Sequence, residues 1–353
     1  MLETAINEEK LNEFMGKVIC DMGAAISGAL IVVGDRLGLF KALAANGAMN
    51  AASLAAATDT HSRYVQEWLS HMASAGYINY DATAETFSMT PEQAAAFAVE
   101  SSPALVTGGF YAIASIYNDE SKLADAFKSG DGIAWGDHHS CLFCGTAKFF
   151  KPGYEANLVQ SWLPALDGMK DQLESGIEVA DVGCGYGLST MIMAEAYPNS
   201  NFVGFDIHEK SIAEATRLAT EKGITNVRFE VATAKDFAGT NYGLVAFFDC
   251  LHDMGDPKGA AAHVKQSLAE GGTWMIVEPF ANDKLEDNLN PVGRVYYGFS
   301  TAVCTPASLS QEVGEALGAQ AGEAKLREVV ESGGFTQFRR AFETPLNLVL
   351  EAR

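Results

Sequence analysis

The chain has 353 residues, of which 48% are hydrophobic and 20% charged, and its formal net charge is −21. A chain of this length usually forms more than one compact domain. So acidic a protein is a poor partner for nucleic acid or an anionic membrane surface, whereas it tolerates cationic ligands well.

The N-terminal ten residues are acidic and polar, which argues against a signal peptide. The longest apolar stretch near them, residues 24–33, is followed by Asp35 and Arg36 and is too short to span a bilayer. Six cysteines are scattered without a framework, as expected of reduced thiols. We therefore expect a cytoplasmic protein with no membrane partner.

Apolar periodicity in the N-terminal third predicts three helices followed by a small hairpin. The helices are expected over residues 17–45, from near Asn50, and over 63–75 with a cap at 58–60; the hairpin strands are expected over 77–80 and 86–89. This order is typical of a winged-helix domain, which we place at residues 1–115.

A winged helix raises the possibility of DNA binding, but the charges oppose it. The first 115 residues hold five Lys and Arg against twelve Asp and Glu, a net charge of −7. DNA binding requires cations that neutralise phosphates. We expect instead a module that forms a homodimer through its apolar first helix, with no nucleic-acid partner.

Residues 116–170 alternate between helical and irregular patterns and are predicted to form a helical connector that covers a substrate. Trp135, His138 and Tyr154 are candidates for lining an acceptor pocket there, although aromatic packing explains them as well. The run H138-H-S-C-L-F-C144 has a single C-x-x-C without a second pair at metal spacing. We therefore predict no metal site.

From residue 177 strands alternate with helices, the mark of an α/β fold with a parallel sheet. Seven strands are predicted, near residues 177–182, 201–205, 226–231, 243–249, 273–278, 335–342 and 345–352.

The first of these strands runs into a glycine-rich turn, E178-V-A-D-V-G-C-G-Y-G187. Glycines allow a tight turn and the close approach of a ligand to the backbone. The G-x-G-x-G spacing differs from the dinucleotide G-x-G-x-x-G. Asp206 ends the next strand, where a carboxylate can bind ribose hydroxyls. Together they favour a nucleoside site; the alternatives are a purely structural turn and a helix N-cap at Asp206.

These motifs, with F205-D-I207 and V227-R-F-E-V-A-T-A-K-D-F237, resemble those of class I S-adenosylmethionine-dependent methyltransferases. Where many members have Gly-Asp, this chain has Ala232-Thr233. The resemblance implies a set of cofactor contacts: Asp181, Gly183, Gly185, Gly187, Asp206, Ile207, Ala234, Lys235, Asp236 and Phe248. For Asp181 a structural role that satisfies the amides of the turn is an equal alternative.

The segment F247-F-D-C-L-H-D-M-G-D256 follows the fourth strand and resembles the L-H-D-W-S-D type motif of small-molecule O-methyltransferases with a dimerising N-terminal domain. The resemblance implies that His252 is the general base and that Glu278 orients it. A histidine is the usual base near neutral pH. A structural loop histidine is the alternative, and Asp253 is expected to cap the following helix.

Residues 290–304 resemble the insertion that covers the substrate in these enzymes, with Arg294 and Tyr297 as candidate contacts; a packed aromatic helix explains them equally well. We thus expect a Rossmann-like, seven-stranded methyltransferase domain at residues 171–353, behind the winged-helix-like domain. The expected function is methyl transfer from S-adenosylmethionine, giving S-adenosylhomocysteine, to oxygen on a small aromatic or polyketide-like acceptor. A cofactor-binding regulator and a same-fold enzyme with other chemistry are the alternatives.

Overall fold

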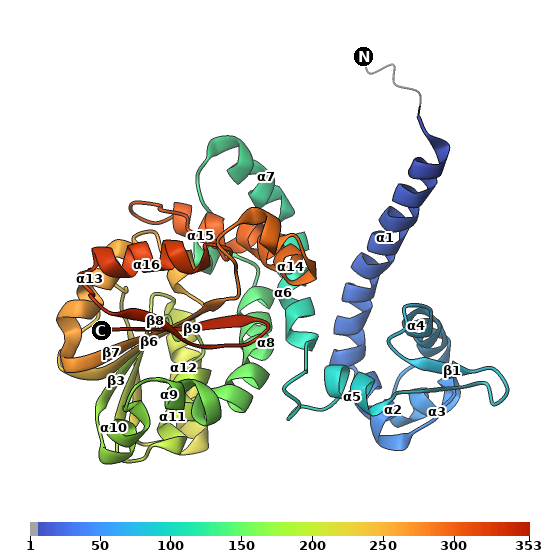
Figure 1. Ribbon diagram of the computed structural model, residues 1–353. Helices are drawn as coiled ribbons and strands as arrows, with labels where there is room; N and C mark the ends of the chain where they lie inside the picture. The colour runs from blue at the N-terminus through green and yellow to red at the C-terminus, as the bar shows by residue number, and fades with distance from the viewer. Residues whose placement is uncertain (1–5) are drawn as a thin grey trace. The chain divides into compact units, whose positions relative to one another are not determined.

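The structure is a computed structural model that describes residues 6–353 (Figure 1). The chain divides into two compact units, one reaching Ala114 and including Cys144–Pro152, the other formed by Ser115–Phe143 and Gly153–Arg353. Part of the predicted connector thus belongs to the first unit, and the three-part division made from the sequence stays a prediction. The expectation of no signal peptide rests partly on residues 1–5, which lie outside the described residues.

The first unit contains the predicted helices and hairpin. Its elements are α1 (Glu8–Arg36), α2 (Leu39–Asn46), α3 (Ala51–Ala57), α4 (Ser62–Ser74), β1 (Asn79–Asp81), β2 (Thr86–Ser88), α5 (Pro91–Phe97) and most of α6 (Thr107–Asn118). The single helix predicted over 17–45 is wrong, because the chain turns at Gly38, whose φ is 68°. The predicted cap at 58–60 is also wrong: His61 is the N-cap of α4, and its ring accepts a hydrogen bond from the Arg63 N–H.

The core of this unit is built around Phe40, which is fully buried. Its ring lies 5.1 Å from that of Phe97 in a stacked arrangement and 4.8 Å edge-on from that of Trp68. The Trp68 indole donates a hydrogen bond to the Leu30 carbonyl, and a Cβ on Gly34 would lie 2.5 Å from the Trp68 ring. Burying a large apolar side chain fully stabilises the fold by about 1.5–3 kcal/mol. The packing of Trp68 against Gly34, with its hydrogen bond to Leu30, therefore joins α4 to α1.

Helix α1 has 29 residues and, by length and composition alone, is apolar enough to cross a membrane. The argument from the sequence that no segment there is long enough is therefore wrong. The expectation of no membrane partner stays a prediction. Large apolar side chains of α1 are exposed along its length, among them Phe14, Ile19, Met22 and Ile26.

The second unit holds a seven-stranded sheet in the order β5-β4-β3-β6-β7-β9-β8, which confirms the predicted strands. The strands are β3 (Glu178–Val182), β4 (Asn201–Asp206), β5 (Val227–Val231), β6 (Tyr242–Phe248), β7 (Leu268–Pro279), β8 (Phe338–Glu343) and β9 (Asn347–Ala352). The five strands from β5 to β7 pair in parallel, whereas β9 is antiparallel to both of its neighbours, β7 and the edge strand β8. The strand order reverses between β3 and β6, and ligands bind at such a reversal, beyond the carboxyl ends of the strands.

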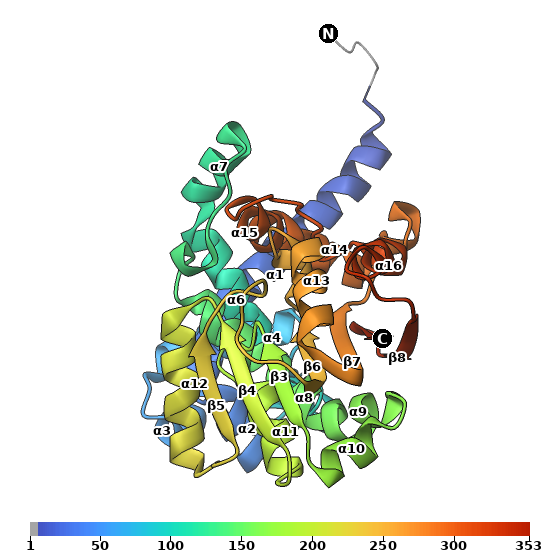
Figure 2. The same ribbon diagram turned by 90° about the vertical axis from the view of Figure 1, so that its left-hand side faces the viewer.

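Helices cover both faces of this sheet (Figures 1 and 2). On one side lie α10 (Met169–Ser175), α11 (Leu188–Ala196) and α12 (Glu209–Lys222); on the other lie α13 (Pro257–Ser267) and α16 (Gly322–Ser332). Buried side chains of α13 and α16, such as Val264 and Val329, form one core with the strand residues Phe247 and Trp274, whose rings lie 5.1 Å apart. The strands are therefore held from both sides, which fixes the loops at their carboxyl ends.

Shorter elements precede the sheet in the chain or lie between its later strands. Those before it are α7 (Glu120–Ser129), η1 (Trp135–Asp137), α8 (Cys141–Asn157), η2 (Leu158–Trp162) and α9 (Leu163–Ala165); those after β6 are η3 (Leu251–Asp253), η4 (Leu285–Asn288), α14 (Pro291–Phe299), η5 (Ser300–Cys304) and α15 (Thr305–Leu309). The loop after α7 is fastened to α15, because the Ile133 N–H donates to the Pro306 carbonyl. A Cβ on Gly132 would lie 2.1 Å from that same oxygen, so this contact requires glycine.

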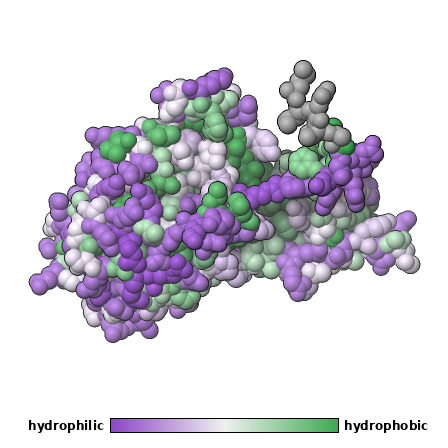
Figure 3. Space-filling view, turned by 45° about the horizontal axis from the view of Figure 1, so that its top comes forward, coloured by the Kyte–Doolittle hydropathy of each residue, from purple (hydrophilic) through white to green (hydrophobic). Residues whose placement is uncertain are grey.

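The surface agrees with the composition. Hydrophilic residues cover much of the face drawn in Figure 3, with apolar residues in smaller groups between them. This is the surface expected of a chain with a net charge of −21.

Candidate active site

Three glycines turn the chain at the carboxyl end of β3. Gly183, Gly185 and Gly187 have φ angles of 76°, 53° and 69°, in the left-handed region that side chains disfavour. A Cβ on Gly183 would lie 2.7 Å from the Cys250 sulfur, and a Cβ on Gly187 would lie 2.4 Å from the Phe229 ring. At Gly185 no described atom lies within 4 Å of that position. Two of the glycines thus make room for the protein's own side chains, and Gly185 leaves the backbone open to a ligand.

The Asp206 carboxylate lies directly beside this turn. One oxygen accepts a hydrogen bond from the Gly185 N–H and the other from the His208 N–H, both at 2.8 Å. Burial raises the pKa of Asp206 above its ordinary value. The alternative of a helix N-cap at Asp206 is wrong, because His208 is the N-cap of α12. The structure therefore brings Gly185 and Asp206 together as the sequence predicts.

Asp181 is fully buried behind the turn. Its Oδ2 atom accepts hydrogen bonds from the hydroxyls of Ser189 and Thr190, both at 2.7 Å, and so anchors the start of α11. Both bonds come from side-chain hydroxyls, whereas the structural alternative expected Asp181 to accept bonds from the backbone amides of the turn. Its Oδ1 atom has no hydrogen-bond partner among the described residues. Burial raises the pKa of this carboxyl to about 6.

An open pocket of about 410 Å³ adjoins Asp206 at the ends of β4 and β5. Its walls include two of the predicted cofactor residues, Ile207 and Asp236, together with Glu230, Val231, Ala232, Thr233 and Ala238. Asp236 accepts hydrogen bonds from the backbone and hydroxyl of Thr233 and so shapes the loop. Lys235 points to Asp256 and Glu312, with which it forms ion pairs, and Ala234 packs against the core.

The predicted base and its orienting residue form a buried pair. His252 Nδ1 lies 2.5 Å from Glu278 Oε2, while the other Glu278 oxygen accepts the Leu251 N–H at 3.0 Å. Both side chains are almost fully buried. Burial alone lowers the pKa of His252, but the charges of Glu278 and Asp253 outweigh it and hold that pKa well above 6.5. The imidazolium form is therefore strongly stabilised.

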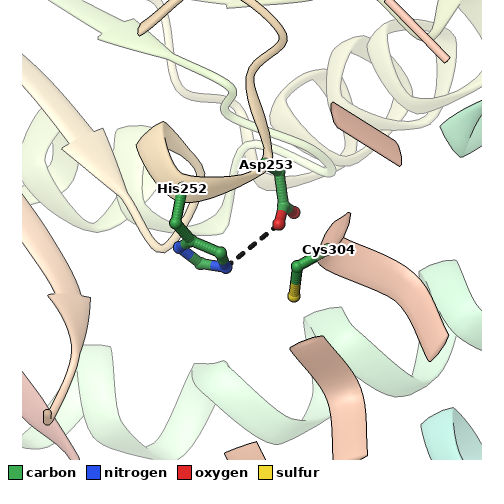
Figure 4. Close-up of side chains that lie close together, drawn as sticks. All are labelled: His252, Asp253 and Cys304. Atoms are coloured by element: carbon green, nitrogen blue, oxygen red, sulfur yellow. Dashed lines mark ion pairs between the residues drawn. The ribbon is translucent and has the colours of Figure 1, made fainter. Parts of the chain in front are cut away.

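The other ring nitrogen faces Asp253 and Cys304 (Figure 4). His252 Nε2 lies 3.0 Å from Asp253 Oδ1, and the donor atoms of the three residues lie within 4.8 Å of one another. Burial raises the pKa of the Cys304 thiol to about 12, so the thiol is neutral. The expectation that Asp253 caps the next helix is wrong, since Asp256 is the N-cap of α13 and accepts the Gly259 N–H.

An aromatic wall continues from the end of β6. The rings of Tyr154 and Phe248 lie 5.4 Å apart, and the Tyr154 hydroxyl donates to Asp249 at 3.3 Å. Asp249 also accepts a hydrogen bond from Asn347 and has a φ of 51°. Burial and the charge of Glu278 raise its pKa well above the ordinary value. Sequence reasoning missed Asp249, although an acidic residue directly after an apolar strand is the same signal that singled out Asp206.

The remaining predicted acceptor residues are dispersed. His138 is buried next to Asp119, and the Trp135 ring lies 5.7 Å from that of Phe143. On α14, Arg294 is exposed and Tyr297 is half-buried. The structure therefore places Tyr154 next to the predicted cofactor residue Phe248.

Comparisons with known proteins agree with this geometry. Residues 173–334 match a family model described as a methyltransferase domain, and residues 24–98 match an Rv2258c-like winged HTH domain.

Among curated proteins, the ubiquinone biosynthesis O-methyltransferase of Leptothrix cholodnii is 26% identical over 151 residues, 42% of this chain and 61% of that protein. The 2-methyl-6-phytyl-1,4-hydroquinone methyltransferase of Synechocystis is 26% identical over 192 residues, 53% of this chain and 60% of that protein. A tRNA (guanine-N(7)-)-methyltransferase of Hydrogenovibrio crunogenus is 40% identical over only 50 residues, 14% of this chain and 21% of that protein. The chain thus spans at most about three fifths of these relatives.

Solved structures match over nearly the whole chain. Human N-acetylserotonin methyltransferase, in complex with S-adenosylmethionine, has a TM-score of 0.69 at 16% identity and covers 100% of this chain and 99% of its own. The mitomycin 7-O-methyltransferase has a TM-score of 0.66 at 15% identity and covers 98% of this chain and 100% of its own. At identities of 15% and 16% the similarity shows that the fold is shared.

The fold and the family match together define a class I S-adenosylmethionine-dependent methyltransferase domain. In the sequence it follows a segment that matches an Rv2258c-like winged HTH domain. The class predicted from the sequence is confirmed.

Proposed function

We propose that this protein transfers a methyl group from S-adenosylmethionine to an oxygen atom of a small, aromatic or polyketide-like molecule. One observation carries the proposal: two features lie at the carboxyl ends of neighbouring strands of one sheet. The open glycine turn and Asp206 lie at the ends of β3 and β4. The buried pair of His252 and Glu278 lies at the ends of β6 and β7. When bound, S-adenosylmethionine supplies an electrophilic methyl group on a sulfonium cation. An in-line displacement there gains most of its rate from positioning.

The residues present fit this cofactor. Gly185 leaves open space where its methionine part would pass, and Asp206 keeps free lone pairs for ribose hydroxyls besides its two backbone bonds. Ile207 and Asp236 line the adjoining pocket, where the adenine would lie. The unpaired oxygen of Asp181 adds negative potential, which suits a sulfonium cation.

His252 is proposed as the general base. In its neutral form Nδ1–H donates to Glu278, which leaves the lone pair of Nε2 for the acceptor hydroxyl. The proton of that hydroxyl then moves to Nε2, and Glu278 and Asp253 stabilise the imidazolium that forms. The same charges that raise the pKa of His252 therefore favour its acceptance of the proton.

The first test is thermal unfolding with S-adenosylmethionine, S-adenosylhomocysteine or NADH. A ligand at about 100 times its dissociation constant stabilises the fold by about 2.7 kcal/mol. We expect the two adenosyl ligands to stabilise it and NADH to have no effect. Stabilisation by NADH alone would overturn the proposal; stabilisation without any methylated product across an acceptor screen would favour a cofactor-binding regulator.

A second test concerns the base. His252→Asn is expected to bind S-adenosylhomocysteine normally and to lose about 10²–10⁴-fold in kcat. The matched control is His263→Gln, because His263 lies on α13 and its ring hydrogen-bonds the Phe237 carbonyl, not Glu278 or Asp253. Equal kcat values for His252→Asn and the native protein would remove His252 from the mechanism.

We further propose that α1 forms a homodimer. Met15, Ile19, Met22 and Ile26 follow helical spacing along one face and are all exposed. The competing role for this domain is DNA binding, and it is disfavoured because Arg63, the one Lys or Arg of the would-be recognition helix α4, is already paired with Glu67. Light scattering should show a dimer that Ile19→Asp disrupts and that Lys10→Glu, on the opposite face, preserves. A monomeric native protein that binds lipid vesicles would refute this.

A further inference from the structure

A second imidazole–carboxylate pair joins His138, in the segment between α7 and α8, to Asp119, the N-cap of α7. His138 Nδ1 is 3.3 Å from Asp119 Oδ2, and the side chain of His138 is only 2% exposed. The same carboxylate oxygen accepts the His139 N–H at 2.7 Å, while Asp119 Oδ1 binds the Lys122 ammonium at 2.8 Å. Asp119 is therefore held in place by three partners.

The pKa of His138 is shifted in the opposite direction to that of His252. Burial lowers the pKa of His138 despite the opposing charge of Asp119, so its ring is neutral. Burial raises the pKa of Asp119, but the Lys122 ammonium and the His139 N–H outweigh burial and hold that pKa below its ordinary value. A carboxylate only accepts hydrogen bonds, so the single ring proton of His138 sits on Nδ1. Its Nε2 atom carries a lone pair.

That Nε2 atom is buried and has no hydrogen-bond partner among the described residues. By contrast, each ring nitrogen of His252 faces a carboxylate. A buried acceptor without a donor is costly and calls for an explanation, such as a ligand that completes it.

The surroundings of His138 place it on the side of the predicted base. Its loop is fastened to α15 through the bond from Ile133 to Pro306. Helix α15 directly follows η5, whose last residue, Cys304, lies beside His252 and Asp253. The charge of Asp253 also acts on the His138 ring.

We propose that His138 Nε2 accepts a hydrogen bond from a second hydroxyl or N–H group of the methyl acceptor. The preferred acceptor class is then a polyphenol or a hydroxylated arylamine, because a simple monophenol leaves this buried atom unpaired. The inference rests on the proposed function, since it concerns the acceptor of that reaction.

Two variants of His138 separate the proposed bond from Nε2 to the methyl acceptor from the structural bond to Asp119. His138→Asn retains an amide that can donate to Asp119 but has no atom at the Nε2 position, whereas His138→Gln places an amide oxygen there. His139→Asn is the matched control, because an Asn oxygen can replace the His139 ring as acceptor of the Cys141 N–H. Titration calorimetry on the complex with S-adenosylhomocysteine would compare naphthalenediols of different hydroxyl spacing with β-naphthol.

We expect at least one diol to bind native protein about tenfold or more tightly than β-naphthol, the scale of one unsatisfied buried group. This preference should vanish in His138→Asn and persist in His138→Gln and His139→Asn. An undiminished preference in His138→Asn, or no preference for any diol in native protein that binds S-adenosylhomocysteine, would overturn the inference. Failure to bind S-adenosylhomocysteine would instead refute the proposed function, and this inference with it.

Discussion

Alanine substitution at two glycines of the turn should separate ligand approach from packing. Gly185 and Gly187 have similar positive φ angles, 53° and 69°, so the backbone strain of an alanine, about 1–2 kcal/mol, is common to both. At Gly187 the new Cβ would also meet the Phe229 ring at 2.4 Å and Ala215 at 3.1 Å. Such overpacking costs a further 1–3 kcal/mol or so. At Gly185 the Cβ enters open space.

We therefore expect Gly187→Ala to lower the free energy of unfolding by about 2–5 kcal/mol and Gly185→Ala by only about 1–2 kcal/mol. Conversely, the methyl group at Gly185 would obstruct the cofactor and weaken S-adenosylhomocysteine about 10- to 100-fold. Urea unfolding measures the first quantity and titration calorimetry the second. Native affinity in Gly185→Ala would refute the assignment of the open backbone to the cofactor, and native stability in Gly187→Ala would refute the packing argument.

Three further substitutions probe the carboxylates. Asp206→Asn should weaken S-adenosylhomocysteine by about 100-fold, because charge-assisted bonds to the ribose are lost; calorimetry showing native affinity would contradict this. Glu278→Gln keeps an acceptor for the Leu251 N–H but removes a charge that raises the pKa of His252, so the pH–rate profile should move to lower pH; an unmoved profile would separate the pair from catalysis. The pKa of Asp181 is about 6 in the fold against an ordinary 3.8, so its protonation stabilises the fold below pH 3.8, and this contribution is lost as the pH rises through about 6. Between about pH 5 and pH 8 that loss amounts to about 1.4 kcal/mol, and Asp181→Asn should abolish it in urea unfolding curves.

The sequence predicted the sheet well because parallel strands between covering helices are continuous apolar runs. It also predicted that the glycine turn and Asp206 meet, since residues at the carboxyl ends of adjacent parallel strands share one edge. The pairing of His252 with Glu278 was expected from the family resemblance, and the structure brings the two residues together from the ends of β6 and β7 at the same edge. These are consequences of topology, and topology follows from the alternation of elements.

Helix ends and long-range partners were not predictable in this way. The break at Gly38 lies within an unbroken helical periodicity, and the pattern alone does not distinguish it from a tolerated glycine. The pairing of His138 with Asp119 joins residues at the two ends of a segment that contains α7, the loop after it and η1. The approach of Cys304 to His252 depends on how the insertion after β7 folds back over the sheet. No local periodicity encodes such contacts.

The different surroundings of the three glycines in the turn show that a sequence motif says less about function than the geometry does. Gly183 and Gly187 admit Cys250 and Phe229, and only at Gly185 is the space beyond the backbone open. The two histidines make the same point for protonation, because each has a carboxylate partner, yet burial outweighs the partner at His138 and does not at His252. Residue identity alone would assign both rings the same chemistry. The number of carboxylates facing each ring, one for His138 and two for His252, separates a ring whose neutral form is favoured from one whose affinity for a proton is raised.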